Sequence, residues 1–205
     1  MTDSVLNLIV YKPVTVYPQE KDFIEKFVLG GNFPWFWKQG QTFDTEFFFN
    51  KHLPDWFRPY LKHYNPQFFS HALLPVAKNG EQSHLTRQQE EFSPYYEFFL
   101  ELFHRFMSDN NLKYSKIYRA ALNFNCYNDL THTEPHVDHD WPHCNFIMYL
   151  NTCDNGQTLI WPSDFSSTNF IPCIEYTAVA FKQQWHAHRY PAPKQRRVVF
   201  VVTYI

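Results

Sequence analysis

Glycine is scarce in this sequence, with 5 among 205 residues, whereas 14 prolines interrupt the chain. Turns are therefore expected to be led by proline and to be relatively stiff. The sequence has no uninterrupted apolar run of membrane-spanning length, so a transmembrane helix is not expected. It also lacks low-complexity tracts, internal repeats and linkers, and its length predicts one domain, residues 1–205.

The chain has no excess of positive charge, because 18 basic and 20 acidic residues give a formal net charge of −2. It therefore has no long-range positive field to attract nucleic acid or an anionic membrane. The four cysteines form no CxxC motif, and the opening residues, MTDSVLNLIVYK, lack the long apolar segment of a secretory signal. We expect a cytoplasmic location and neither nucleic acid nor membrane as a partner.

Aromatic residues are abundant instead, at 20% of the chain, which suits a well-buried core with some rings left for a pocket. The first part, residues 1–116, predicts a strand in LNLIVYK, a helix from Pro18 to the Gly30-Gly31 pair, and a second helix that begins at Ser93-Pro94. Residues 32–90 are proline-broken aromatic clusters, which predict long loops with short helices that shape a substrate pocket. We expect this half to be helical and loop support.

The period of the apolar residues changes to two in the second part, residues 117–205. The strand-like runs are KIYRAALNFNCY, NFIMYLN, QTLIWP, YTAVAF and RVVFVVTYI, separated by segments rich in turn formers. At least five strands after a helical half predict a mainly β fold with flanking helices, as in an antiparallel sandwich or jelly roll.

The stretch EPHVDHDWPHC, residues 134–144, concentrates three histidines and three carboxylates. If HVD lies in a strand, His136 and Asp138 point to the same face. Such a pair needs a third ligand, and a triad of two histidines and one carboxylate leaves open positions on ferrous iron for a co-substrate and dioxygen. The candidates for the third ligand are His186 and His188, in QQWHAHRYPAPKQRRVVF.

These motifs follow one another in the order LNFNCY, HVD, MYLN, GQTLIWP, WHA and RVVFVVTY. In this order the chain resembles the Fe(II)/2-oxoglutarate-dependent dioxygenases, and the prolyl-4-hydroxylase-like group in particular, over roughly residues 117–205. The resemblance implies a double-stranded β-helix, which is a jelly-roll core of the cupin type. It also implies Fe(2+) as cofactor, 2-oxoglutarate and dioxygen as co-substrates, and an arginine that binds the far carboxylate of 2-oxoglutarate.

The resemblance implies that His136, Asp138 and His186 hold the metal, because His186 stands where the family's WHA-like segment places its distal histidine. His188 stands where the family usually has a small residue, and we interpret it as a supporting or surface residue. A zinc site built from the remaining histidines is an alternative. Its members would be His132, His139, His143 and Cys144, but they have no matching second cluster and lie in a proline-rich loop. We expect His139, His143, Glu134 and Asp140 at the rim of the site.

Two neighbouring arginines, Arg196 and Arg197, open the last strand. An inward Arg197 has small valine and threonine neighbours on its face, whereas an inward Arg196 would be crowded by Phe200 and Tyr204. The family's last strand also aligns with Arg197. We therefore assign Arg197 to the carboxylate, which a guanidinium can bind with two parallel hydrogen bonds.

Further candidates for 2-oxoglutarate binding lie on two strands. Tyr149 matches a tyrosine that helps to hold the same carboxylate in the animal oxygen-sensing prolyl hydroxylases, and it would otherwise be a core tyrosine. Before HVD, the polar side chains of one strand face are those of Arg119, Asn123, Asn125 and Tyr127. The last three of these either hydrogen-bond 2-oxoglutarate or line a wet edge.

The resemblance implies a hydroxylase that couples 2-oxoglutarate decarboxylation, which yields succinate, to hydroxylation of a substrate C–H bond. The related halogenases carry a small residue in place of Asp138, so halogenation is disfavoured. The substrate is either a small molecule or a peptidyl residue. The alternatives are a non-catalytic cupin-like binding or structural module, a nucleic-acid demethylase of the same superfamily, and a zinc hydrolase.

Overall fold

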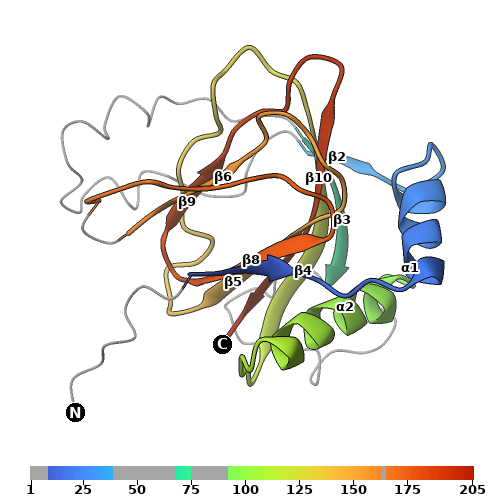
Figure 1. Ribbon diagram of the computed structural model, residues 1–205, viewed down its shortest axis with the longest axis horizontal. Coiled ribbons are helices and arrows are strands. Elements are labelled where there is room, and N and C mark those ends of the chain that lie inside the picture. The colour runs from blue at the N-terminus through green and yellow to red at the C-terminus, as the bar shows by residue number, and fades with distance from the viewer. Residues whose placement is uncertain (1–8, 39–67, 75–91, 163–164) are drawn as a thin grey trace.

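The structure is a computed structural model that describes residues 9–38, 68–74, 92–162 and 165–205 (Figure 1). Its elements in chain order are β1 (Ile9–Pro13), α1 (Pro18–Phe23), the π-helical turn η1 (Ile24–Val28), β2 (Phe36–Lys38), β3 (Phe68–Leu74), α2 (Tyr96–Asp109), β4 (Ile117–Cys126), β5 (Cys144–Tyr149), β6 (Thr158–Trp161), β7 (Asn169–Ile171), β8 (Thr177–Lys182), β9 (Trp185–His188) and β10 (Arg196–Tyr204). Within these ranges no helix is long and apolar enough to cross a membrane.

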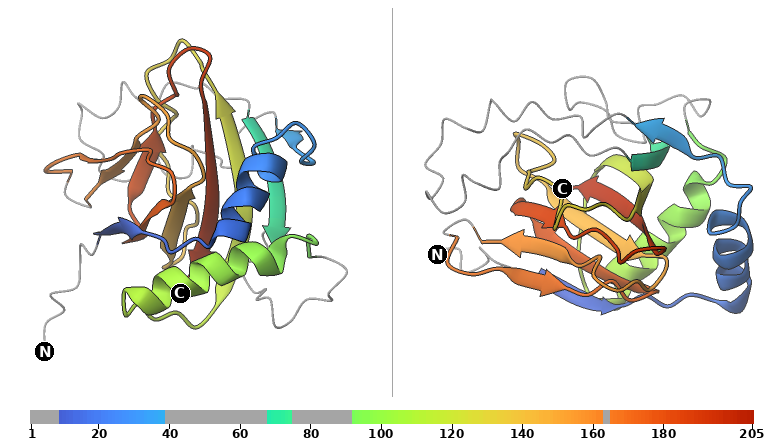
Figure 2. Two further views of the ribbon diagram at one scale, coloured as in Figure 1. Left: turned by 45° about the vertical axis from the view of Figure 1, so that its right-hand side comes forward. Right: turned by 90° about the horizontal axis from the view of Figure 1, so that it is seen from above.

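The strands form two sheets whose neighbouring strands are all antiparallel. The large sheet has the order β1-β8-β5-β10-β4-β3-β2, and the small sheet has the order β7-β6-β9. The small sheet lies across from one face of the large sheet, and α1 and α2 lie against the opposite face (Figures 1 and 2). This arrangement confirms the predicted mainly β, jelly-roll-like fold with flanking helices.

The outer face of the large sheet packs against α2, and together they form a buried hydrophobic core. The helical stripe that the sequence predicted is buried, and Phe99 packs on Phe200 while Phe103 packs on Phe146, with ring centroids 5.2 Å apart in both pairs. Burial of one such ring contributes about 1.5–3 kcal/mol. The helix begins at Tyr96, where the backbone N–H donates to the carbonyl of Ser93. The helix start therefore lies slightly after the predicted one.

The inner face of the large sheet carries a second buried cluster, which it shares with the small sheet. This cluster comprises Ile147, Tyr149, Cys153, Ile160, Ile171, Cys173, Val179, Phe181, Val199 and Val201. Along β10 the alternation places Val198, Phe200 and Val202 in the outer cluster, so Arg197 begins the inward-facing set. The space between the two sheets is thus lined mainly by apolar side chains, and Arg197 is a charged residue among them.

The first half of the chain is less helical than the sequence predicted. β1 overlaps the strand predicted in LNLIVYK, and helices lie in both regions where they were predicted, but β2 and β3 also join the large sheet. β3 lies in the region predicted to be loop, where it pairs with β4 from Phe69 to Leu74. Such pairing depends on partners far away in the sequence, and these outweigh local signals such as Pro66. The rest of the predicted substrate-pocket region, residues 39–67 and 75–90, lies outside the described residues.

Candidate metal centre

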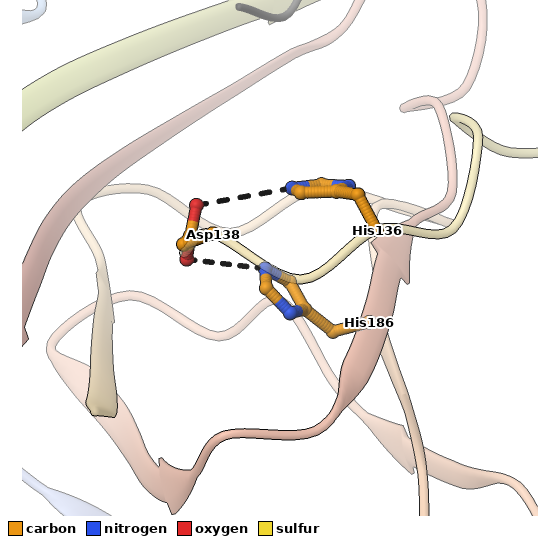
Figure 3. Close-up of side chains that lie close together, drawn as sticks. All are labelled: His136, Asp138 and His186. Carbon is orange, nitrogen blue, oxygen red and sulfur yellow. Dashed lines mark ion pairs between the residues drawn. The ribbon is translucent and has the colours of Figure 1, made fainter. Parts of the chain in front are cut away.

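Three side chains from two distant parts of the chain meet inside the barrel that the two sheets enclose. The ligand atoms of His136, Asp138 and His186 all lie within 4.8 Å of one another (Figure 3). His186 Nε2 lies 3.5 Å from Asp138 Oδ2, and His136 Nε2 lies 4.0 Å from Asp138 Oδ1. Among the described residues no other group of three possible ligands forms, so the alternative cluster of His132, His139 and His143 does not assemble there.

The backbone brings the two histidines together through an isolated antiparallel bridge. His136 N–H donates to the His186 carbonyl and His186 N–H donates to the His136 carbonyl, both at 2.9 Å. His186 lies within β9, as the resemblance implied for the distal histidine, but His136 forms only this isolated bridge and Asp138 lies in a bend, so neither belongs to a regular strand. The bridge to His186 therefore positions His136 and Asp138, whereas the sequence had predicted that a strand would do so.

Each of the two imidazoles has its Nδ1 atom engaged by the backbone two residues earlier. His136 Nδ1 lies 3.1 Å from the Glu134 carbonyl oxygen, and His186 Nδ1 lies 3.1 Å from the Gln184 carbonyl oxygen. A carbonyl oxygen can only accept, so Nδ1 carries the proton in both rings. In the neutral rings the lone pair is then on Nε2, which faces Asp138, and this tautomer suits metal ligation.

The charges of the site favour an ionised Asp138 carboxylate beside a neutral His186 imidazole. Burial acts to raise the pKa of the Asp138 carboxyl, but His186, His136 and Arg119 together lower that pKa well below its usual range. Burial is the main cause that lowers the pKa of His186 to about 4, with a contribution from His136. Near neutral pH the triad therefore offers one anionic oxygen ligand and a neutral imidazole at His186.

A second polar cluster surrounds Arg197, deep in the barrel. Arg197 is 3% exposed, and its Nε donates to the Gly156 carbonyl while its Nη2 donates to Thr158 Oγ1, both at 2.9 Å. The hydroxyl of Tyr149 donates to the same Thr158 oxygen at 2.6 Å, and the Tyr149 ring lies 5.5 Å from the guanidinium carbon. Because Thr158 Oγ1 accepts twice, its own proton remains for another acceptor.

The structure separates the two candidate arginines. Arg196 is exposed on the outer side, where it lines a surface pocket with Phe124, Cys126 and Tyr127. Tyr127 is 46% exposed and donates to Asp129, so it does not join the Arg197 cluster as the sequence had suggested. The strand ends at Cys126, and the alternation that would have turned Tyr127 inward ends with it.

The two asparagines of β4 face the interior beside the last strand. Asn125 pairs with Arg197 and Asn123 pairs with Val199 in the antiparallel register, so their side chains share the inward face. Asn123 Oδ1 accepts a hydrogen bond from Ser70, whereas Asn125 is 3% exposed and its Oδ1 has no partner within the described part of the chain. A buried oxygen without a partner costs about 1–3 kcal/mol, which a bound donor would recover.

Sequence reasoning missed Thr158 and left His188 as either a supporting or a surface residue. Thr158 lies opposite His188 in the pairing of β6 with β9, and both alternate onto the face that carries His186. The structure excludes the surface alternative for His188, because its Nε2 is buried and has no partner among the residues that the structure describes. Burial together with Arg197 lowers the pKa of His188 well below the usual value. Because His186 and His188 are two residues apart, their spacing already indicated that they share one face of a strand.

His139 and His143 are buried rather than at the rim, at 3% and 4% exposure. The His139 ring stacks on Trp141 with centroids 4.2 Å apart, and its Nε2 hydrogen-bonds Thr203 Oγ1 at 3.0 Å. Burial lowers the pKa of His139 to about 4 and also lowers the pKa of His143. The loop after Asp138 thus packs into the barrel, which holds the carboxylate in place.

Comparison with known proteins gives matches by structure. No protein-family model and no curated protein matches the sequence. A 2OG-Fe(II) oxygenase family oxidoreductase from Burkholderia pseudomallei is 15% identical, with 98% of this chain and 85% of that chain covered and a TM-score of 0.66. The 2-oxoglutarate-dependent carbocyclase SnoK from nogalamycin biosynthesis is 8% identical, with 97% and 79% covered and a TM-score of 0.55.

A prolyl-4-hydroxylase from Pseudomonas putida also matches, at 12% identity over 67% of this chain and 68% of that chain, with a TM-score of 0.42. At these identities the likeness shows the fold. The chain has the fold of the 2OG-Fe(II) oxygenases, as its sequence resemblance implied.

Proposed function

We propose that this chain is an Fe(II)- and 2-oxoglutarate-dependent oxygenase. The observation that carries the proposal is the combination of two sites in one barrel: a triad of two histidines and one carboxylate, and a buried arginine that neutralises no carboxylate in the described part of the chain. The oxygenase fold of the structural neighbours supports the same reading. A non-catalytic cupin-like module would not need both sites.

The triad fits ferrous iron by its donor set. His136 Nε2, His186 Nε2 and a carboxylate oxygen of Asp138 would hold the metal on one side and leave other positions open. When bound, ferrous iron supplies the oxidising chemistry by which 2-oxoglutarate and dioxygen give succinate, carbon dioxide and an oxidised substrate. The chain orients these ligands through the Nδ1 hydrogen bonds and excludes bulk water by burying His186.

Arg197 would bind the far carboxylate of 2-oxoglutarate. Its guanidinium is fixed by Gly156 and Thr158, so little conformational freedom is lost on binding. Tyr149, Thr158 and Asn125 lie around it, and the free proton of Thr158 gives a further donor for the carboxylate. His188, two residues from the distal ligand on the same face, extends the polar lining between the metal and Arg197.

Hydroxylation is the reaction we propose within this class. Asp138 occupies the third ligand position, and a carboxylate there takes the place that a halide would need. The neighbouring structures include a carbocyclase, so the fold hosts more than one outcome. Four free thiols are consistent with the cytoplasmic location that the sequence predicts.

Metal-dependent binding of 2-oxoglutarate tests the proposal without knowledge of the substrate. Isothermal titration calorimetry of the protein, loaded with redox-silent Mn(II), should show 2-oxoglutarate binding that disappears in the metal-free protein and in Asp138→Ala. Binding of equal strength with and without metal would contradict the proposed site.

A further inference from the structure

Arg119 is a second arginine of the barrel interior, and it lies at the opposite end of the paired strands β4 and β10 from Arg197. It belongs to β4, where it pairs with Thr203 of β10, whereas Arg197 pairs with Asn125 at the other end of the same two strands. Arg119 Nη1 lies 3.6 Å from Asp138 Oδ1. A fixed positive charge therefore stands beside the carboxylate of the proposed metal site.

The hydrogen-bonding capacity of Arg119 is not used within the described part of the chain. The 3.6 Å separation from Asp138 is an ion pair and exceeds hydrogen-bond distance, and the guanidinium makes no hydrogen bond to any residue that the structure describes. Arg197, by contrast, donates hydrogen bonds from both Nε and Nη2, to the Gly156 carbonyl and to Thr158 Oγ1. A guanidinium carries five N–H donors, so Arg119 can still offer a pair of them to an anion.

Exposure divides the site into an open side and a closed side. The side chains of Arg119, His136 and Asp138 are 23%, 17% and 11% exposed, whereas that of His186 is 7% exposed and Arg197 is 3% exposed. A substrate that approaches the metal from solvent therefore meets Arg119. Arg197, the proposed co-substrate ligand, is buried and less accessible from solvent than Arg119.

We propose that Arg119 receives an anionic group of the substrate, a carboxylate or a phosphate, and so holds the reacting carbon beside the triad. This inference rests on the proposed function and narrows its substrate to molecules that carry such a group. The same row across the sheet continues from Arg119 to Thr203, which bonds His139, and to the buried amide of Asn145, whereas the next inward pair, Val201 and Ile147, is apolar. Thr203, Asn145, Val201 and Ile147 carry no charge, so Arg119 supplies the positive charge of this row. In the barrel's low dielectric an anion paired with a guanidinium is held more strongly than in water.

A structural role for Arg119, as a support for Asp138 alone, makes a different prediction. A support would affect metal binding whatever the substrate, whereas an anion receptor discriminates between charged and neutral forms of one molecule. Contact with 2-oxoglutarate instead of substrate would alter the KM for 2-oxoglutarate. The test must therefore compare matched compounds and both KM values.

The experiment measures succinate release by the Fe(II)-loaded full chain with 2-oxoglutarate, with and without paired compounds. The carboxylate pairs are L-amino acids and their carboxamides, and the phosphate pairs are nucleoside 5′-monophosphates and their nucleosides. We expect only the anionic compound of one pair to stimulate succinate release. Whether that pair is of the carboxylate or the phosphate type identifies the group that Arg119 binds. The variants are Arg119→Gln, Arg119→Lys and, as a control, Arg196→Gln, which removes an exposed arginine outside the barrel.

In Arg119→Gln the KM for the stimulating anion should rise about tenfold or more, while the KM for 2-oxoglutarate changes less than about threefold. Arg119→Lys should recover part of the loss, and Arg196→Gln should behave as wild type. Calorimetry of the same anion with Mn(II)- and 2-oxoglutarate-loaded protein should show the same loss of affinity in Arg119→Gln.

Three results would overturn the assignment. In the first, the neutral compounds stimulate succinate release as strongly as the anionic ones or are the only ones to do so. In the second, wild-type protein releases succinate but no anionic compound stimulates it, and in the third, Arg119→Gln changes only the KM for 2-oxoglutarate. Wild-type protein that releases no succinate under any condition would instead contradict the proposed oxygenase function.

Discussion

His186 Nε2 lies 3.5 Å from Asp138 Oδ2, although one residue belongs to β9 and the other to the bend that follows His136. This contact brings a neutral imidazole and a carboxylate together at a buried point where neither is neutralised by the other. Arg119 Nη1 already lies 3.6 Å from Asp138 Oδ1, and a metal ion bound between the imidazole and the carboxylate would give Asp138 Oδ2 and the lone pair of His186 Nε2 a partner as well.

The first prediction separates the two histidines of β9. His186→Gln should weaken metal binding about 100-fold or more because it removes a ligand, whereas His188→Gln should leave the metal affinity within about tenfold of wild type. Equilibrium dialysis with Co(II) measures both. A larger loss in His188→Gln than in His186→Gln would reverse the ligand assignment.

The second prediction concerns Arg197. Arg197→Gln should weaken 2-oxoglutarate binding to the Mn(II)-loaded protein by about 2–3 kcal/mol, because a charge-assisted contact to the carboxylate is lost. Calorimetry measures the effect, and urea unfolding checks that the variant is folded. The matched control is Arg196→Gln, whose exposed side chain should contribute nothing. Equal affinities in the two variants would remove Arg197 from the site.

The third prediction tests the support of that arginine. Gly156 has a φ of +54°, and an added Cβ would overlap the Cys153 sulfur and approach Arg197 Cδ to 3.7 Å. Gly156→Ala should therefore lower the free energy of unfolding by about 1–3 kcal/mol and weaken 2-oxoglutarate binding. Gly31→Ala, where a Cβ would meet no atom within 4 Å, should change the stability by less than about 0.5 kcal/mol. Similar losses in both variants would show that the crowding at Gly156 is unimportant.

The fourth prediction is a pH dependence of the metal-free protein. Burial lowers the pKa of His139 from 6.5 to about 4 in the folded state, so between these values the unfolded chain binds a proton that the folded chain does not. Stability should therefore fall as the pH drops through this window, by at most about 1.4 kcal/mol per pH unit for this group. Urea unfolding at several pH values should show a shallower fall for His139→Gln. Parallel curves would exclude His139 as a contributor.

Local patterns in the sequence were sufficient for some elements. The apolar stripe of α2 and the alternation in β4, β5 and β10 predict those elements closely, because each pattern is complete within its own segment. The HVD spacing and the distal histidine likewise indicated a triad that the folded chain brings together.

Other features depend on partners that are distant in the sequence. β3 gains its strand conformation by pairing with β4, and Asp138 is placed by a bridge between His136 and His186 and not by a strand. In the sequence Thr158 has the pattern of an ordinary strand residue, and only its pairing opposite His188 shows that it lines the polar interior. His139 is buried because it stacks on Trp141 and bonds Thr203, which no local pattern indicates.

The central claim is tested most directly by succinate release from 2-oxoglutarate. Wild-type protein loaded anaerobically with Fe(II), and then given 2-oxoglutarate and oxygen, should release succinate, whereas Asp138→Ala and Arg197→Ala should release about 100-fold less or none. Absence of succinate from the wild type in every condition, or equal release from all three proteins, would contradict the account.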